Sequence, residues 1–186
     1  LQRLLGRPIK LCEPLAGCGV RGVRFAAEVE GVEEVVMNDA NPRACKLAEL
    51  NAKAAGVSDR VRVVRSEAAA LLTSIEFRHR FDFVDVDPFG TPAPFIEPAL
   101  RAVRVGGVVA LTATDMPPLC GVQPRACIRK YGAKPLRTEY CHELAVRILV
   151  GHAAIEAAKH ELAAEPVFCH YSDHYVRAYL KVLRGA

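Results

Sequence analysis

The stretch of this sequence with the clearest chemical content is FDFVDVDPFG, at residues 81–90. It places Asp87, Pro88 and Phe89 at the predicted end of a strand. An exocyclic base amine is a poor nucleophile because its lone pair is delocalised into the ring. A carboxylate and a backbone carbonyl that accept its hydrogens would draw the lone pair toward an electrophile, while an aromatic face holds the base flat. These three residues could supply those functions. The alternative is that they form only an Asp-Pro turn followed by a phenylalanine in the core.

A glycine-rich loop lies in EPLAGCGVRGVRF, where Gly17, Gly19 and Gly22 form G-x-G-x-x-G between a predicted strand and a predicted helix. Glycines let the backbone approach a ligand closely in front of a helix N-terminus, although a tight turn alone would need them too. Glu13 stands at the end of the strand. Its carboxylate suits the ammonium group of an amino-acid-like ligand better than a pyrophosphate.

Two further acids follow the next two predicted strands. Asp39, in NDANP, lies twenty residues beyond Gly19, where an acid can accept the hydroxyls of a ribose. Glu67 could accept the amino hydrogens of adenine, with the backbone amide of Ala68 reaching the ring. The alternatives are helix capping for Asp39 and an ordinary first-turn acid for Glu67. With the glycine loop, the two acids describe an adenosine site, which a nicotinamide dinucleotide could also use. The DPFG stretch favours methyl transfer to an amine, because an oxidoreductase has no need of it.

Basic residues gather between residues 116 and 138, where five bases and no acid occur in a chain of net charge +4. Arg125, Arg129 and Lys130 are the candidates for phosphate contacts, and a solvated surface loop is the alternative. Asp115 follows the predicted fifth strand. It could order that loop or contact a base.

The seven cysteines have irregular spacings and are expected to be reduced. Cys120, Cys127, Cys141 with His142, and Cys169 with His170 show no paired spacing of a zinc knuckle. The sequence therefore predicts buried thiols and no metal.

The elements that must position these residues alternate along the chain. Strands are expected at 9–12, 34–37, 61–64, 83–86, 108–112, 167–170 and 175–182, and helices at 20–29, 42–55, 67–72, 94–103 and 139–163. In the last helix, Leu144, Ile148, Ile155 and Leu162 fit a buried stripe. This alternation predicts an α/β fold with a doubly wound, mainly parallel seven-stranded sheet, whose ligand sits at the carboxyl ends of the strands.

Length and composition fit one globular domain. The 186 residues are 51% apolar and 25% charged, and no apolar run is long enough for a membrane span or a signal peptide. We expect a cytoplasmic protein that does not associate with membranes, and no protein partner is implied. Because the chain starts at Leu1 rather than at a methionine, we expect a fragment of a longer protein.

Several segments together resemble the tRNA guanine-26 N2-dimethyltransferases, whose fold is the Rossmann-like S-adenosylmethionine-dependent methyltransferase type. They occur in the family's order and are PLAGCGVRGVRF, NDANP, DVDPFGTPAPF, TATDMPPLCG, CIRKYGAKPLR, YCHELAVRIL and SDHYVRAYLKV. DPFG is similar to the family's variant of the amino-methyltransferase motif. Where the family often shows an aspartate pair, this chain has Ser66 and Glu67.

The resemblance implies S-adenosylmethionine as methyl donor and N2 of a tRNA guanosine, methylated once or twice, as acceptor. It implies donor binding by Arg21, Asp39, Glu67 and Ala68, catalysis by Asp87 and stacking of the guanine on Phe89. Residues 1–186 would be the catalytic domain, without the N-terminal segment and the C-terminal tRNA-binding domain of the family. The alternatives are an amino-methyltransferase for another nucleobase and a nucleotide-binding Rossmann oxidoreductase.

Overall fold

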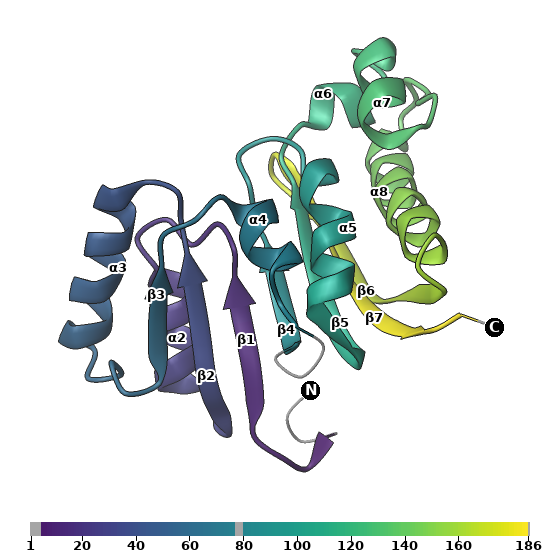
Figure 1. Ribbon diagram of the computed structural model, residues 1–186. Helices are drawn as coiled ribbons and strands as arrows, with labels where there is room; N and C mark the ends of the chain where they lie inside the picture. The colour runs from purple at the N-terminus through teal and green to yellow at the C-terminus, as the bar shows by residue number, and fades with distance from the viewer. Residues whose placement is uncertain (1–4, 77–79, 186) are drawn as a thin grey trace.

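A computed structural model of the chain describes residues 5–76 and 80–185 and shows one seven-stranded sheet between helices (Figure 1). The strands are β1 (Ile9–Glu13), β2 (Val32–Asn38), β3 (Val61–Val64), β4 (Phe81–Val86), β5 (Val103–Ala113), β6 (Leu162–Ser172) and β7 (Tyr175–Arg184). Their spatial order is β3-β2-β1-β4-β5-β7-β6, with β1 to β5 parallel and β7 antiparallel to both of its neighbours. The doubly wound, mainly parallel sheet expected from the sequence is confirmed.

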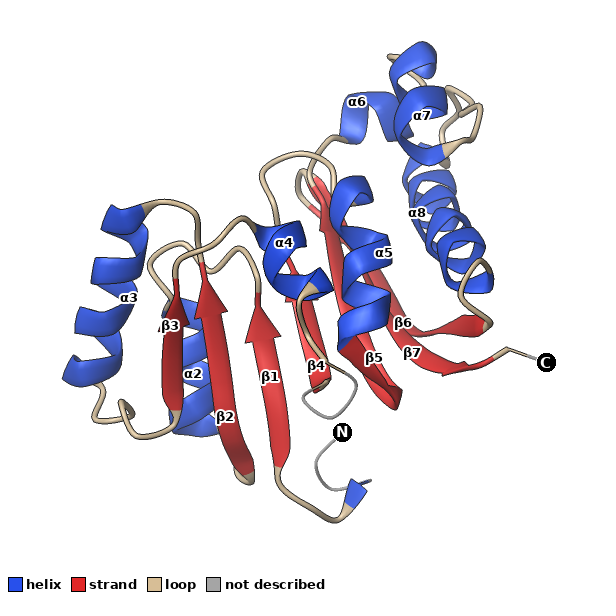
Figure 2. Cartoon of the chain, viewed as in Figure 1, coloured by secondary structure: helices blue, strands red, loops and turns tan. Residues whose placement is uncertain are grey.

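The helices connect these strands on both faces of the sheet (Figure 2). They are α2 (Val20–Glu28), α3 (Pro42–Ala54), α4 (Ala68–Thr73), α5 (Ala93–Ala102), α6 (Met116–Leu119), α7 (Pro124–Tyr131) and α8 (Cys141–Ala158). Helices α4 and α5 lie in front of the sheet in this view, α2 lies behind it, and α8 packs beside β6 and β7.

Local sequence signals explain where several helices begin and end. Helix α3 starts after Asn41, whose side chain accepts a hydrogen bond from the Arg43 amide at 2.9 Å, and Pro42 occupies its first position. Helix α7 ends at Gly132, which adopts the left-handed conformation (φ 67°) that terminates helices. These caps satisfy backbone groups that a helix end would otherwise leave unpaired.

Two apolar clusters hold the layers together. The larger one joins α4, α5 and α8 to the central strands, with Ile96, Leu100 and Leu149 fully buried. The smaller one lies between α2, α3 and the strands β1 and β2, around Val35 and Met37. Burying each of these side chains contributes about 1.5–3 kcal/mol, so both clusters fix the strand ends in place.

The sequence prediction for the last helix was wrong in two respects. The helix ends at Ala158 rather than at residue 163, because the chain reverses at Glu161 (φ 56°) and β6 begins at Leu162. Its buried stripe is made of small residues with one leucine, and Ile155 is 60% exposed. The buried positions are Ala145, Leu149, Ala153 and Ala157. Alanines at a four-residue spacing allow the helix axis to approach the sheet closely, which the larger residues would prevent.

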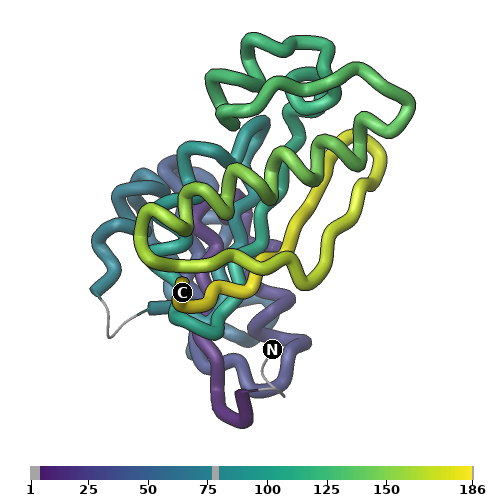
Figure 3. The backbone as a smooth tube through the Cα atoms, turned by 90° about the vertical axis from the view of Figure 1, so that its right-hand side faces the viewer, coloured from purple at the N-terminus to yellow at the C-terminus, as the bar shows by residue number. Residues whose placement is uncertain are grey.

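The chain between β5 and α8 carries α6 and α7 and stands beyond the carboxyl ends of the parallel strands (Figure 3). It contains the basic segment, so these bases lie at the end of the sheet where ligands bind in such folds. Among the described residues, no helix is long and apolar enough to cross a membrane.

Candidate active site

Three acids meet at the carboxyl ends of neighbouring strands. Glu13 is the last residue of β1, Asp39 follows β2, and Asp87 follows β4. Strand β1 lies between β2 and β4 in the sheet, so the order of the strands brings the three acids together at the carboxyl end of the sheet. The ligand site predicted from the sequence lies at this end of the sheet.

The glycine loop requires its glycines for two different reasons. Gly19 is the N-cap of α2 and has φ 74°, a backbone conformation that residues with a Cβ atom rarely adopt. At Gly22 the problem is space, because a Cβ atom would lie 2.4 Å from Glu13 Oε2 and 2.5 Å from Met37 Sδ. The loop therefore packs closely against the buried Glu13 carboxylate.

Glu13 is 4% exposed, and its Oε2 has no hydrogen-bond partner in the part of the chain that the structure describes. Burial, reinforced by the charge of Asp85, raises the pKa of Glu13 to about 7, despite the opposing effect of Arg21. A buried carboxylate without a partner is costly unless a ligand supplies one. This supports the prediction that Glu13 receives an ammonium group.

Asp39 organises the glycine loop. Its Oδ2 accepts a hydrogen bond from the Gly17 amide at 2.9 Å, and its Oδ1 accepts one from the Asn41 amide at 2.8 Å. The helix-capping alternative for Asp39 is wrong, because Asn41 caps α3. Each oxygen can accept a further hydrogen bond, so contact with a ribose stays a prediction.

Glu67 caps a helix, which is close to the alternative considered from the sequence. It precedes α4, and its Oε2 accepts a hydrogen bond from the Ala70 amide at 2.8 Å. Ala68 is the first residue of α4 and is buried. Their contact with an adenine stays a prediction.

Asp87 is held by Arg21 of α2, which the resemblance assigned to donor binding. The Arg21 guanidinium donates to Asp87 Oδ2 and, at 2.8 Å, to Oδ2 of the buried Asp85 in β4. Burial lowers the pKa of Arg21, but the two carboxylates outweigh burial and raise it above its usual value. Arg21 therefore stays charged and fixes one oxygen of Asp87, while Oδ1 lies outside this contact.

Arg177 of β7 holds Asp85 from the other side. Its Nη2 donates to Asp85 Oδ1 at 2.7 Å, its Nη1 donates to the Thr112 hydroxyl, and its Nε donates to the Tyr179 hydroxyl at 2.9 Å. Arg177 is 8% exposed. Burial lowers the pKa of Arg177, but the charge of Asp85 together with the hydrogen bonds to Tyr179 and Asp85 raises it overall. A continuous chain of charged contacts thus runs from Arg177 through Asp85 and Arg21 to Asp87.

The DPFG turn projects its aromatic ring outward. Pro88 is buried, whereas Phe89 is fully exposed, so the alternative of a core phenylalanine is wrong. Gly90 anchors the turn to the end of β5, because its amide donates to Thr114 Oγ1 at 2.7 Å and its carbonyl accepts from the Thr114 amide at 2.9 Å. The ring is free to contact a ligand, and its stacking on a base stays a prediction.

Two cavities open beside Asp87 and Arg21. The smaller, of about 300 Å³, is bounded by Glu13 and the glycine loop. The larger, of about 720 Å³, is bounded by residues of β5, β6 and β7, including Arg177 and Tyr175. Asp87 and Arg21 line both cavities, so a group bound in one would meet a group bound in the other at this acid.

Comparison with known proteins shows the family of the chain. The model of the family described as N2,N2-dimethylguanosine tRNA methyltransferase matches residues 1–186. The chain belongs to this family. The tRNA (guanine(26)-N(2))-dimethyltransferase of Methanothermobacter thermautotrophicus is 45% identical over 186 residues, which are the whole of this chain and 48% of that protein. The corresponding protein of Methanocaldococcus jannaschii is 47% identical over 179 residues, or 95% of this chain and 47% of that protein.

A solved structure extends the similarity to the fold. Trm1 from Pyrococcus horikoshii, solved with S-adenosyl-L-methionine, superposes with a TM-score of 0.91 at 39% identity, covering all of this chain and 53% of that one. The chain spans about half the length of the relatives that it matches. Membership of the N2,N2-dimethylguanosine tRNA methyltransferase family favours the methyltransferase interpretation of the glycine loop over the oxidoreductase alternative.

In this family member, two of the predicted RNA-contact residues pair with each other. Asp115 Oδ2 accepts from Lys130 Nζ at 2.9 Å, and its Oδ1 accepts from the Tyr131 hydroxyl at 2.7 Å. Asp115 therefore orders the loop, which was one of its two predicted roles. Arg125 and Arg129 are exposed on α7, and neither forms an ion pair with another described residue. They are the better candidates for phosphate contacts.

The seven cysteines differ in burial. Cys127 is fully buried, as predicted, whereas Cys120, Cys141 and Cys169 are partly exposed. The fold brings Cys120, Cys141 and His142 together, which their sequence spacing did not indicate.

Sequence reasoning missed Asp85 and Arg177. Asp85 lies inside an alternating run whose pattern indicates only a buried strand, and Arg177 lies within an apolar strand. The available signal was the charge itself, because a charged residue at a buried strand position needs a partner.

Proposed function

We propose that this protein transfers a methyl group from S-adenosylmethionine to the exocyclic N2 amine of guanosine 26 in tRNA, once or twice. The observation that carries the proposal is the position of Asp87, which lines two adjoining cavities. It is supported by the similarity of the chain to tRNA (guanine(26)-N(2))-dimethyltransferases. Residues 1–186 would then be the catalytic domain. Because the substrate would be tRNA, we also propose that the protein acts in the cytoplasm.

The residues of the smaller cavity fit S-adenosylmethionine. The carboxylate of Glu13, which lines this cavity, suits the ammonium group, and the glycine loop allows close approach of the methionine portion. The rest of the donor would extend beyond the residues that line this cavity. There Asp39 would accept the ribose hydroxyls, and Glu67 with Ala68 would border the adenine. When bound, the donor supplies an electrophilic methyl group on its sulfonium.

The larger cavity would take the guanine. Phe89 is not among the residues that line this cavity, and its exposed ring would stack on the base from outside. Asp87 Oδ1 and the carbonyl of Pro88 would accept the two hydrogens of the N2 amine and so draw its lone pair toward the methyl group. Transfer would form the new N–C bond while the bond between the methyl group and the donor's sulfur breaks, which leaves a neutral thioether. The amine would lose a proton, which Asp87 could accept. Arg21 holds the carboxylate in place during this step.

Mass spectrometry of tRNA nucleosides tests this proposal. The protein is incubated with S-adenosylmethionine and a tRNA transcript, and we expect N2-methylguanosine, N2,N2-dimethylguanosine or both. A matched transcript with inosine at position 26 lacks the amine and should remain unmodified. Methylation of that transcript would move the target to another position, and methylation of adenosine would show that the acceptor base is wrong.

A titration separates the donor assignment from the oxidoreductase alternative. S-adenosylhomocysteine and NADH are each added to the protein in a calorimeter, and we expect binding of the former only. Selective binding of NADH would contradict the proposed cofactor.

A further inference from the structure

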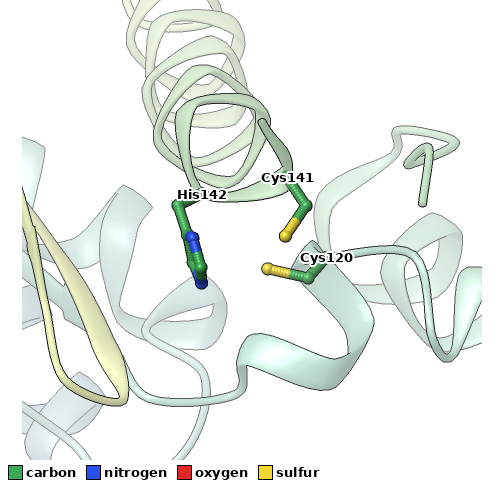
Figure 4. A group of neighbouring side chains, drawn as sticks. All are labelled: Cys120, Cys141 and His142. Atoms are coloured by element: carbon green, nitrogen blue, oxygen red, sulfur yellow. The ribbon is translucent and has the colours of Figure 1, made fainter. Parts of the chain in front are cut away.

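Two cysteines and a histidine converge where α6 and α8 meet (Figure 4). Cys120 follows the last residue of α6, and Cys141 and His142 are the first two residues of α8. The Sγ atoms of the two cysteines and a ring nitrogen of His142 all lie within 4.8 Å of one another. In Figure 4 the two thiols point toward each other and the imidazole ring lies beside them.

This set of donor atoms matches the preference of one class of ion. Thiolate and imidazole are the usual ligands of zinc in proteins, whereas magnesium and calcium prefer oxygen. A tetrahedral zinc ion with ordinary Zn–S bonds places two sulfur atoms about 3.8 Å apart. The two sulfur atoms lie within 4.8 Å of each other, so they need to approach by no more than about 1 Å, which side-chain rotation can supply.

The surroundings favour ligation by these side chains. Cys141 and His142 are adjacent in the first turn of α8, so one helix end carries two of the three donor side chains. The His142 ring stacks on the ring of Tyr171 in β6, with centroids 3.7 Å apart and an angle of 19° between the planes. This contact orients the imidazole ring beside the thiols. Metal-binding histidines are commonly oriented by neighbouring groups in the same way.

We propose that Cys120, Cys141 and His142 bind one zinc ion, with a water molecule as the fourth ligand. Binding releases the protons of the two thiols and leaves both sulfurs as thiolates. The ion joins the two ends of the segment 121–140, which contains α7 with Arg125 and Arg129. It therefore fixes the position of the basic segment relative to α8, whether or not that segment binds tRNA.

Metal analysis of the purified protein tests the site without an activity assay. After removal of metal by a chelator under reducing conditions, the protein is titrated with Co²⁺ and then with Zn²⁺. We expect one equivalent of Co²⁺ to give the absorption bands of a tetrahedral thiolate site, and Zn²⁺ to displace it. We also expect zinc to raise the melting temperature of the metal-free protein.

Single substitutions locate the ligands. Cys141→Ser, Cys120→Ser and His142→Ala should each weaken Co²⁺ binding at least tenfold, whereas Cys169→Ser, a change at another partly exposed cysteine, should leave it unchanged. Circular dichroism checks that each variant is folded. Equal binding by wild type and Cys141→Ser, or absence of a thiolate spectrum from the reduced wild type, would overturn the proposal. Peptide mapping that finds a Cys120–Cys141 disulfide instead of metal uptake would overturn it too.

Discussion

Asp85 and Arg177 are 92 positions apart in the chain, yet Asp85 Oδ1 accepts a hydrogen bond from Arg177 Nη2 at 2.7 Å in the buried centre of the sheet. The same carboxylate holds Arg21, which in turn holds Asp87. We infer that Asp85 and Arg177 are positioning residues that act on Asp87 through Arg21. Neither needs to touch a substrate for this role.

Asp85→Asn should therefore lower both stability and turnover. Removing one partner from a buried ion pair leaves uncompensated charge and costs on the order of 3–5 kcal/mol of unfolding free energy, measured by urea denaturation. In the folded variant, the fold decrease in kcat should exceed the fold increase in KM. The reason is that Asp87 is misplaced, whereas the residues proposed to bind the substrates are unchanged. Asp82→Asn is a matched control, because Asp82 is buried in the same strand and pairs with Arg7 and Arg104 away from the cavities. An equal fall in kcat for Asp82→Asn would contradict the positioning role.

Asp87→Asn should slow methyl transfer strongly and leave the fold intact. The amide keeps the size of the carboxylate but cannot take the proton of the amine, so we expect a rate loss of about 10²–10⁴-fold. Calorimetry with S-adenosylhomocysteine should show binding within a few-fold of wild type. Asp59→Asn, at an exposed acid that pairs with its neighbour Arg60, should retain full activity. An Asp87→Asn variant as active as Asp59→Asn would remove Asp87 from the mechanism.

Glu13 should make both stability and donor binding depend on pH. Its pKa rises on folding from 4.5 to about 7, so the folded state retains this proton when the unfolded state has lost it. The stabilisation is present below pH 4.5 and is lost as pH rises through 7, an effect on the order of 3 kcal/mol. Glu13→Gln should remove this dependence, as urea denaturation between pH 4.5 and 8 would show.

Donor affinity should change in the opposite direction, because an ammonium group pairs with the ionised carboxylate. For wild type, affinity for S-adenosylhomocysteine should rise about tenfold per pH unit below pH 7 and level off above it. In Glu13→Gln the affinity should be lower and nearly independent of pH over this range. A pH profile shared by both proteins would exclude Glu13 as the ammonium partner.

Gly22→Ala should weaken the donor site, because the added Cβ would lie 2.4 Å from Glu13 Oε2. We expect a decrease of about 1–3 kcal/mol in unfolding free energy and weaker binding of S-adenosylhomocysteine. Gly151→Ala is the control, since Gly151 lies inside α8 and a Cβ atom there would meet no described atom within 4 Å. That change should stabilise the protein by about 0.5–1 kcal/mol. Stabilisation by Gly22→Ala would show that the loop is looser than described.

Arg125 and Arg129 should contribute to tRNA affinity by binding phosphates. Replacing both by alanine should weaken tRNA binding and reduce the slope of log K against log salt by roughly 1.4–1.8, because each phosphate that an arginine neutralises accounts for about 0.7–0.9 of that slope. Arg101→Ala, at an exposed arginine in the last turn of α5, should leave the slope unchanged. Filter binding at several salt concentrations measures both. Identical slopes for all three proteins would place the RNA surface elsewhere.

The sequence by itself determined the type of sheet and the position of the acids at the carboxyl ends of its strands. Strands alternating with helices dictate a parallel sheet, and residues that directly follow parallel strands must meet at one end of it. Glu13, Asp39 and Asp87 could therefore be placed together from local pattern alone.

The tertiary structure decided the contacts that depend on packing between distant elements. The Arg177 to Asp85 pair needs β7 inserted antiparallel beside β5, and the cluster of Cys120 with Cys141 and His142 needs α6 to meet α8. Likewise, the true end of α8 and its alanine stripe follow from β6 pairing with β7 and from close approach of helix and sheet. Local patterns carry no information on such pairings, because their energy comes from contacts that exist only after folding.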